Sequence, residues 1–270
     1  MKKAILACSV FYKEIKSLVE EKEDVFVKLM PQGLHDLPDE MRMQKKLQTA
    51  IDELEAEYDL EYIFMAYGFC SGGVEGLTTS KAELVIPKFH DCIPLLLGDK
   101  DAGGNLENTG VYYLSRGWID CGGDTYKQHL AMTGELSGLI EKFKKYEEEN
   151  KDAIVDWYDM DMYNDRKQYS QEMAEEISFQ CLKSYEAIVL IDNGNLAPIH
   201  YEYAKEMHAK IDEILQKQRE EKLDFKIKKG DLKLLADLIN FENLPESRQQ
   251  ELVLRNPPGQ PLRLEKKLIG

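Results

Sequence analysis

Apolar residues in this chain fall into short runs that alternate with longer stretches in which they recur every three or four positions. A short run rich in β-branched and aromatic residues is typical of a buried strand, whereas the three-to-four spacing is typical of an amphipathic helix. In the N-terminal part we predict strands at 3–8, 24–30, 61–67 and 82–87. Helices are predicted between and after them, at 10–22, 39–57 and 89–98.

The remainder of the chain repeats this alternation around a helical middle section. We predict further strands at 111–114, 187–192, 222–229 and 251–255, and helices over most of 124–184 and at 230–239. Alternating strands and helices predict a mostly parallel sheet flanked by helices, and therefore an α/β fold. We expect two Rossmann-like lobes with a helical connection, and one continuous domain is the alternative. The expected segments are an N-terminal lobe at 1–123, a connection at 124–184 and a C-terminal lobe at 185–270.

The charge of the chain narrows its range of partners. Its formal net charge is −15, which argues against binding to nucleic acid or to an anionic membrane surface, because both call for a basic face. No stretch approaches the roughly 18 apolar residues of a membrane-spanning helix. The apolar N-terminus is broken at residues 13–16, without a clean signal-peptide cleavage site. We therefore expect a cytoplasmic protein, in which the five cysteines are thiols or ligands rather than disulfides.

Three cysteines stand just beyond predicted strands: Cys8, Cys70 and Cys92. The carboxyl ends of parallel strands meet at one edge of a sheet, where open α/β folds bind their ligands. Thiolates select soft metals, and three of them suit zinc or a [4Fe–4S] cluster. The sequence therefore predicts a metal or iron–sulfur site. The opposing interpretation is that these are small buried hydrophobes, since no paired Cys-x-x-Cys spacing is present.

Other residues are candidates for the same site. The spacing His-x-Cys that begins at His90 is similar to the zinc motif of methyltransferases that activate a thiol, which makes His90 a candidate ligand. His35 follows the second strand and is a candidate acid–base catalyst, a ligand or a turn residue being the alternatives. Cys121 is a fourth candidate ligand, whereas Cys181 is expected to lie in the core.

Two groups of residues are candidates for binding a substrate. The pair Gly72-Gly73 would let the backbone approach a ligand closely, although it belongs to no nucleotide-binding pattern. Arg116 lies near Tyr112, Tyr113 and Trp118 in the sequence, and an arginine beside aromatic rings suits an anionic or planar ligand. We therefore take Arg116 as a second candidate catalytic residue and the three aromatic residues as the lining of its pocket. An aromatic cluster packed in the core is an equal alternative.

Several blocks of the sequence resemble a bacterial and archaeal family of unknown function. They extend from residue 3 to about residue 259 and are, in chain order, Ala7-Cys8, Leu34-His35-Asp36-Leu37-Pro38, Tyr67-Gly68-Phe69-Cys70-Ser71-Gly72, His90-Asp91-Cys92, Tyr113-Leu114, Ala187-Ile188-Val189-Leu190-Ile191-Asp192, Lys229-Gly230-Asp231-Leu232-Lys233-Leu234-Leu235 and Pro257-Pro258-Gly259. The chain departs from many relatives at Ser9, where they have glycine, and at Asp91, which separates a histidine and a cysteine that are adjacent in them. Genes of this family often neighbour corrinoid-dependent methyltransferases of the trimethylamine type. The resemblance therefore implies a place in corrinoid-linked one-carbon metabolism.

These features lead to one preferred hypothesis and two alternatives. We expect a protein that binds a [4Fe–4S] cluster or zinc and acts in corrinoid-linked metabolism, on a small methylated or sulfur-containing substrate. The first alternative is a non-catalytic accessory protein that binds a corrinoid protein or delivers a metal. The second is a metal-free enzyme with Cys70 as nucleophile and His35 or His90 as base. Whether the chain is an enzyme, and whether it forms a homo-oligomer, stays open.

Overall fold

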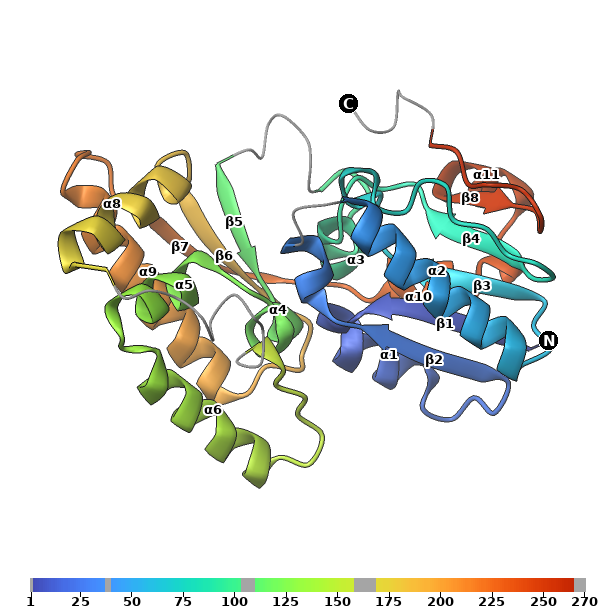
Figure 1. The fold of residues 1–270 in the computed structure, drawn as a ribbon, viewed down its shortest axis with the longest axis horizontal. Helices are drawn as coiled ribbons and strands as arrows, with labels where there is room; N and C mark the ends of the chain where they lie inside the picture. Colours follow the sequence, from blue (N-terminus) through green and yellow to red (C-terminus); the bar gives the residue numbers. More distant parts are fainter. Residues whose placement is uncertain (1, 37–39, 103–109, 158–168, 265–270) are drawn as a thin grey trace. The chain divides into compact units, whose positions relative to one another are not determined.

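The chain folds into two compact units, each built on its own sheet (Figure 1). The computed structural model describes residues 2–36, 40–102, 110–157 and 169–264. Unit 1 comprises Met1–Asn105 together with Gly230–Gly270, and unit 2 comprises Leu106–Lys229. These boundaries differ from the expected segments, because the helical middle section belongs to unit 2 and the end of the chain returns to unit 1.

Unit 1 contains a five-stranded sheet in the order β2-β1-β3-β4-β8. Its strands are β1 (Lys3–Cys8), β2 (Val25–Met30), β3 (Tyr62–Ala66), β4 (Glu83–Pro87) and β8 (Val253–Asn256). The first four are parallel to one another, and β8 pairs with β4 in the antiparallel direction. Strands β1 and β3 are buried along their whole length, as expected for central strands covered on both faces.

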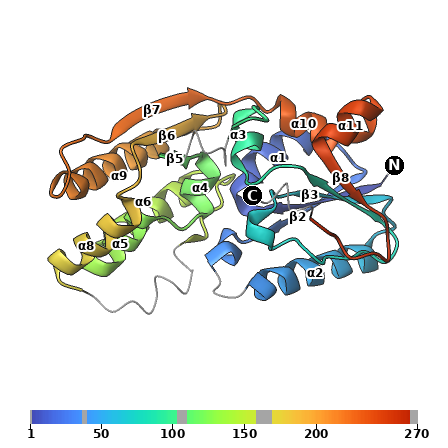
Figure 2. The same cartoon turned by 90° about the horizontal axis from the view of Figure 1, so that it is seen from above.

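The connections of unit 1 place helices on both faces of this sheet. Its α-helices are α1 (Tyr12–Val19), α2 (Glu40–Glu57), α3 (Ile93–Leu97), α10 (Lys233–Ile239) and α11 (Glu246–Leu252), and its short 3-10 helices are η1 (Ser9–Phe11), η2 (Gln32–Asp36), η3 (Cys70–Gly72) and η6 (Phe241–Asn243). Helices α1 and α2 lie on opposite sides of the sheet (Figure 2). Right-handed crossovers require this, because the chain moves from β1 to β2 in one direction and from β2 back past β1 to β3 in the other.

This strand order creates a topological switch point between β1 and β3. The chain leaves β1 toward one side of the sheet to form β2 and later returns to the other side of β1 to form β3. Connections on the two sides therefore run over opposite faces of the sheet and diverge at the carboxyl ends of these two strands. Open α/β sheets bind their ligands at such a point.

A buried lysine holds the C-terminal segment against the first strand of unit 1. The Lys3 ammonium donates to the Ile239 carbonyl at 2.6 Å and to the Glu242 carboxylate at 3.0 Å. The Tyr62 hydroxyl donates to the other oxygen of Glu242 at 2.8 Å. Since Lys3 and Tyr62 begin adjacent strands, these bonds explain why residues after 229 belong to unit 1.

Unit 2 contains a three-stranded parallel sheet in the order β5-β6-β7. Its strands are β5 (Val111–Leu114), β6 (Ala187–Asp192) and β7 (Asp224–Lys229), and its helices are α4 (Arg116–Cys121), α5 (Thr125–Thr133), α6 (Leu136–Glu149), α8 (Gln171–Leu182) and α9 (Pro198–Gln216). Helices α5, α6, α8 and α9 lie on one side of the sheet (Figure 2). There Ile188 and Leu190 of β6 belong to the same buried apolar cluster as Tyr203 and Met207 of α9.

The predicted α/β class is confirmed by the two sheets and their flanking helices. The predicted strands at 3–8, 111–114 and 187–192 coincide with β1, β5 and β6. Pro198 begins α9, and Gly98 ends α3 with a left-handed φ of 71°, as their conformational preferences predict. In the described part of the chain, no helix combines the length and apolar character needed to cross a bilayer.

Candidate functional site

The three cysteines of the predicted metal site follow neighbouring parallel strands of unit 1. Cys8 is the last residue of β1, Cys70 begins η3 after β3, and Cys92 precedes α3 after β4. Two backbone hydrogen bonds join the loop after β3 to the loop after β4, from Phe69 N to Phe89 O at 2.9 Å and from Cys70 N to His90 O at 3.2 Å. All three cysteines therefore lie at the same edge of the sheet.

Gly68 is needed for the close approach of these two loops. A Cβ atom at this position would lie 2.6 Å from the Asp91 Cα, so any side chain would push the loops apart. The other glycines of the motif differ from one another. A Cβ on Gly73 would lie 2.6 Å from the Met43 sulfur of α2, which gives that glycine a packing role, whereas Gly72 has a φ of +93° and open space around it. The predicted substrate-binding role of the Gly72-Gly73 pair stays a prediction.

Cys70 combines an unusual backbone conformation with a desolvated thiol. Its φ of 45° is the only positive value at a non-glycine residue in the described chain, and such conformations cluster at functional sites. Burial raises the pKa of the thiol to about 12, against the opposing effect of a hydrogen bond from the Gly68 backbone. The thiol is therefore neutral at physiological pH. A nucleophilic cysteine needs the opposite shift of its pKa.

Tyr67 follows β3 at the edge of the sheet that carries the thiols, and its hydroxyl is unsatisfied. The parallel pairing of Ala7 with Ala66 continues to the next residues, which places Tyr67 beside Cys8 on the same face of the sheet. Tyr67 is only 1 % exposed, and its hydroxyl has no hydrogen-bond partner among the described residues. Burial raises its pKa well above the ordinary value, and the charges of Cys8 and Cys70 add to this effect. Both thiols thus influence the hydroxyl electrostatically.

His35 completes this group, which we name the Tyr67 cluster: Tyr67, Cys8, Cys70 and His35. The His35 ring stacks on the Tyr67 ring with 6.1 Å between centroids and 18° between planes. Its Nδ1 lies 2.9 Å from the Gln32 carbonyl, which can only accept, so we assign the proton to Nδ1 and the lone pair to Nε2. Histidines that bind metals are commonly oriented by such a bond to a carbonyl.

The Tyr67 cluster has the donor atoms of a soft-metal site but does not form a complete coordination site. Two thiols and an imidazole suit zinc or an iron–sulfur cluster. No group of three His, Cys, Asp or Glu side chains close enough to hold a metal is found among the described residues. His90 is exposed, and its Nδ1 lies 3.7 Å from the Asp91 carboxylate. The structure leaves the roles of Cys92 and His90 as predictions.

Two other cysteines lie in unit 2, and one of them was assigned wrongly from the sequence. Cys181 is exposed rather than in the core, because α8 buries Ala174, Ser178 and Leu182, a four-residue spacing that turns Cys181 outward. Cys121 is buried, with its sulfur 3.4 Å from the Ile154 carbonyl. None of the five cysteines, all of which lie in the described ranges, forms a disulfide.

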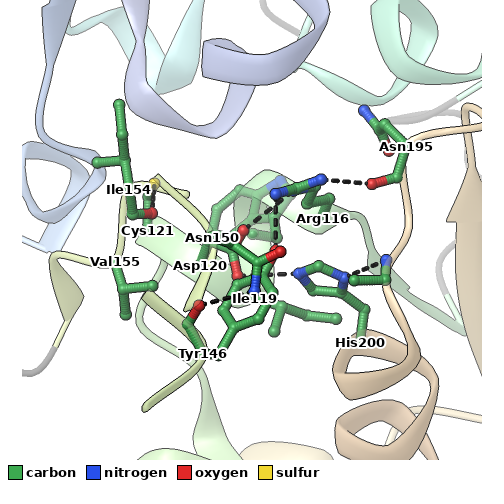
Figure 3. A network of polar contacts seen from close by, with 12 residues as sticks. Arg116, Ile119, Asp120, Cys121, Tyr146, Asn150, Ile154, Val155, Asn195 and His200 are labelled. Atoms are coloured by element: carbon green, nitrogen blue, oxygen red, sulfur yellow. Dashed lines mark hydrogen bonds and ion pairs between the residues drawn. The ribbon is translucent and has the colours of Figure 1, made fainter. Parts of the chain in front are cut away.

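Arg116, the second candidate catalytic residue, also lies in unit 2, in a buried polar network (Figure 3). Its guanidinium donates to the Asp120 carboxylate at 3.3 Å, to the Asn195 carbonyl at 2.6 Å and to the Tyr146 hydroxyl at 2.7 Å. All three nitrogens of the guanidinium therefore have protein partners. This arrangement favours a structural role, and a substrate would have to displace these bonds.

His200 extends the same network and was not identified from the sequence. Its Nδ1 accepts from the Ala197 N–H at 2.7 Å, so Nε2 carries the proton that is donated to Asp120 at 3.0 Å. Both His200 and Asp120 are fully buried. The only sequence signal for this role is that His200 falls in the first turn of a helix that begins at Pro198, where unpaired backbone N–H groups attract side-chain acceptors.

The aromatic residues proposed to line a pocket with Arg116 do not form one lining. Tyr112 and Tyr113 are adjacent in β5, so their side chains point to opposite faces of the sheet. Tyr112 packs edge-on against Tyr185, with ring centroids 5.1 Å apart. Trp118 in α4 packs so closely on Gly122 that a Cβ there would lie 2.6 Å from the indole ring. For Tyr112 and Trp118, these contacts support the packed-cluster alternative.

Comparison with protein families identifies the chain. A family model described as "Protein of unknown function (DUF1638)" matches residues 29–239. The chain belongs to the DUF1638 family. The match includes His35, Tyr67, Cys70 and Cys92 but begins after Cys8, so it covers most of the candidate site of this DUF1638 protein. No curated protein and no solved structure matches the chain.

Proposed function

We propose that this DUF1638 protein is a thiolate-ligated metal or iron–sulfur protein. The metal would be held by Cys8 and Cys70 at the switch point between β1 and β3, with Cys92 as the third ligand. The proposal is supported by one observation above all. Where the strand order of the sheet reverses, Cys8 and Cys70 lie at the same edge as a buried tyrosine hydroxyl without a partner among the described residues, and the imidazole of His35 stacks on that tyrosine ring.

The state of Cys70 favours metal binding over the metal-free nucleophile. A thiol whose pKa is raised to about 12 by burial is a poor nucleophile at neutral pH. Coordination to a metal reverses this situation, because the cation deprotonates its thiol ligand outright. The bound group would supply Lewis acidity if it is zinc, or electron transfer if it is a cluster. His35 would hold or accept a proton at Nε2, beside the metal.

For the reaction, we propose a class of metabolism and of substrate rather than a single chemical step. The resemblance noted in the sequence supports a role in corrinoid-linked one-carbon metabolism, with a small methylated or sulfur-containing substrate or a corrinoid protein as the proposed partner. A thiolate site next to a histidine is suited to handling a methyl group or a sulfur atom. A non-catalytic accessory role, in which the same thiols carry a metal to a corrinoid protein, uses the same site.

Anaerobic purification followed by metal analysis tests this proposal. Several iron atoms per chain and a broad absorption near about 400 nm indicate a cluster, and about one colourless zinc per chain indicates a zinc site. Substituting Cys8→Ser or Cys70→Ser should abolish the bound metal in either case. Cys181→Ser is the matched control and should retain it, because Cys181 is exposed and lies in unit 2.

Two results would contradict the proposal. One is a protein that contains no metal after anaerobic purification and takes none up when iron and sulfide, or zinc, are supplied. The other is full metal content in both Cys8→Ser and Cys70→Ser. Binding of a corrinoid protein without turnover of any methyl donor would select the accessory role.

A further inference from the structure

The hydroxyl of Tyr67 differs from those of three other buried tyrosines, Tyr62, Tyr146 and Tyr203. Tyr62 donates to Glu242, Tyr203 donates to Asp124, and Tyr146 accepts from Arg116. The Tyr67 hydroxyl is equally inaccessible but has no partner among the described residues. Buried polar groups are nearly always hydrogen-bonded, so an exception calls for an explanation. A hydrogen-bond acceptor that forms only when the site binds a metal would provide this explanation.

The position of Tyr67 indicates which acceptor this is. Tyr67 lies beside Cys8 across the β1–β3 pairing, Cys70 begins the short helix that follows, and the charges of both thiols help to raise the pKa of the Tyr67 hydroxyl. A neutral thiol is a weak hydrogen-bond acceptor. A metal-bound thiolate carries negative charge, and hydrogen bonds to charged acceptors are about twice as strong as those between neutral groups.

The Tyr67 ring is held in place before any metal binds. It follows directly after the buried strand β3, and the His35 ring stacks against it. His35 is in turn held by its bond to the Gln32 carbonyl, and the Gln32 N–H donates to the Ser9 hydroxyl at 3.1 Å. Ser9 adjoins Cys8 in the sequence. The Tyr67 ring is therefore held by successive contacts through His35, Gln32 and Ser9 that lead back to Cys8.

We propose that Tyr67 is a positioning residue that donates its hydroxyl hydrogen bond to the metal-bound thiolate of Cys8 or Cys70. This inference rests on the proposed metal site and adds to it a residue that is not a ligand. Hydrogen bonds to ligand sulfur lower the charge density on the metal and orient the ligand. Tyr67 would thus set both the affinity of the site and its electronic spectrum.

Cobalt(II) titration of the metal-free protein tests this role, because cobalt(II) bound by thiolates gives sulfur-to-metal charge-transfer absorption. In Tyr67→Phe the ring and its contact with His35 remain while the hydroxyl is lost. We expect the affinity for cobalt(II) to fall by about tenfold or more and the charge-transfer band to shift. The metal-free variant should be at least as resistant to urea as the wild type, since it loses a hydroxyl that has no partner there.

Tyr62→Phe is the matched control on the same strand. Its hydroxyl is bonded to Glu242, so this variant should unfold at lower urea concentration while binding cobalt(II) with unchanged affinity and spectrum. Identical binding and spectrum in Tyr67→Phe and the wild type would overturn the role of Tyr67 and leave the metal site standing. Failure of the wild type to give thiolate-to-cobalt absorption, together with no uptake of iron and sulfide or of zinc, would overturn both.

Discussion

The network around Arg116 leads to a prediction that separates a structural arginine from a catalytic one. Arg116 is 7 % exposed, and its ion-pair partner Asp120 is fully buried. In Arg116→Met the carboxylate of Asp120 would keep the bond from His200 and its interaction with the charge of Lys127 but would lose the charge of its ion-pair partner. Removing one member of a buried ion pair costs about 3–5 kcal/mol. We therefore expect unit 2 to lose about this much stability.

The two tryptophans of the chain make this loss measurable in unit 2 alone. Trp118 and Trp157 are the only tryptophans, and both lie in unit 2. Their fluorescence during urea unfolding therefore reports on this unit and not on unit 1. With a slope of about 2 kcal/mol per M of urea, a loss of about 4 kcal/mol lowers the midpoint by about 2 M.

Two further variants decide whether the uncompensated charge is the cause. Adding Asp120→Asn to Arg116→Met removes that charge but keeps an acceptor for His200, so the double variant should recover a large part of the lost stability. Lys145→Met removes an exposed cation that is paired with Glu149. This control should change the free energy of unfolding by less than about 0.5 kcal/mol, and so hardly move the urea midpoint. An Arg116→Met midpoint within the range of this control would refute the structural assignment.

Two other predictions concern buried charges elsewhere. Burial raises the pKa of Asp156 to about 6, above its value of about 4 in the unfolded chain. The folded state then binds the extra proton between these values, so unit 2 should lose stability as pH rises from about 4 to about 6. Asp156→Asn should remove this slope and stabilise unit 2 at pH 7 by about 3 kcal/mol, whereas parallel pH profiles of variant and wild type in tryptophan fluorescence would contradict it. In unit 1, Lys3→Met should lower the free energy of unfolding, measured by circular dichroism, by about 2–3 kcal/mol, because Glu242 loses a charged partner. Lys2→Met, at the exposed neighbouring position, should lower it by almost nothing. Equal effects of the two substitutions would disprove the role of Lys3.

The sequence alone determined most of the local structure of this protein. The apolar run that begins at Ala187 is a strand, as predicted, and Pro198 and Gly98 mark the helix ends that their backbone preferences require. The positions of Cys8 at the end of a parallel strand, and of Cys70 and Cys92 in loops that follow parallel strands, also follow from such runs. These features depend on residues a few positions apart, so they can be recognised without knowing the fold.

Only the tertiary structure decided which of these residues meet. It placed β1 between β2 and β3, which creates the switch point beside Cys8 and Tyr67. It also joined Arg116 to the Asn195 carbonyl, 79 residues away, and Lys3 to the Ile239 carbonyl, 236 residues away. The period of a helix or strand says which face of it is apolar but not what covers that face. Whether a buried hydroxyl or guanidinium finds a partner therefore depends on contacts between distant segments, as Tyr67 and Arg116 show in opposite ways.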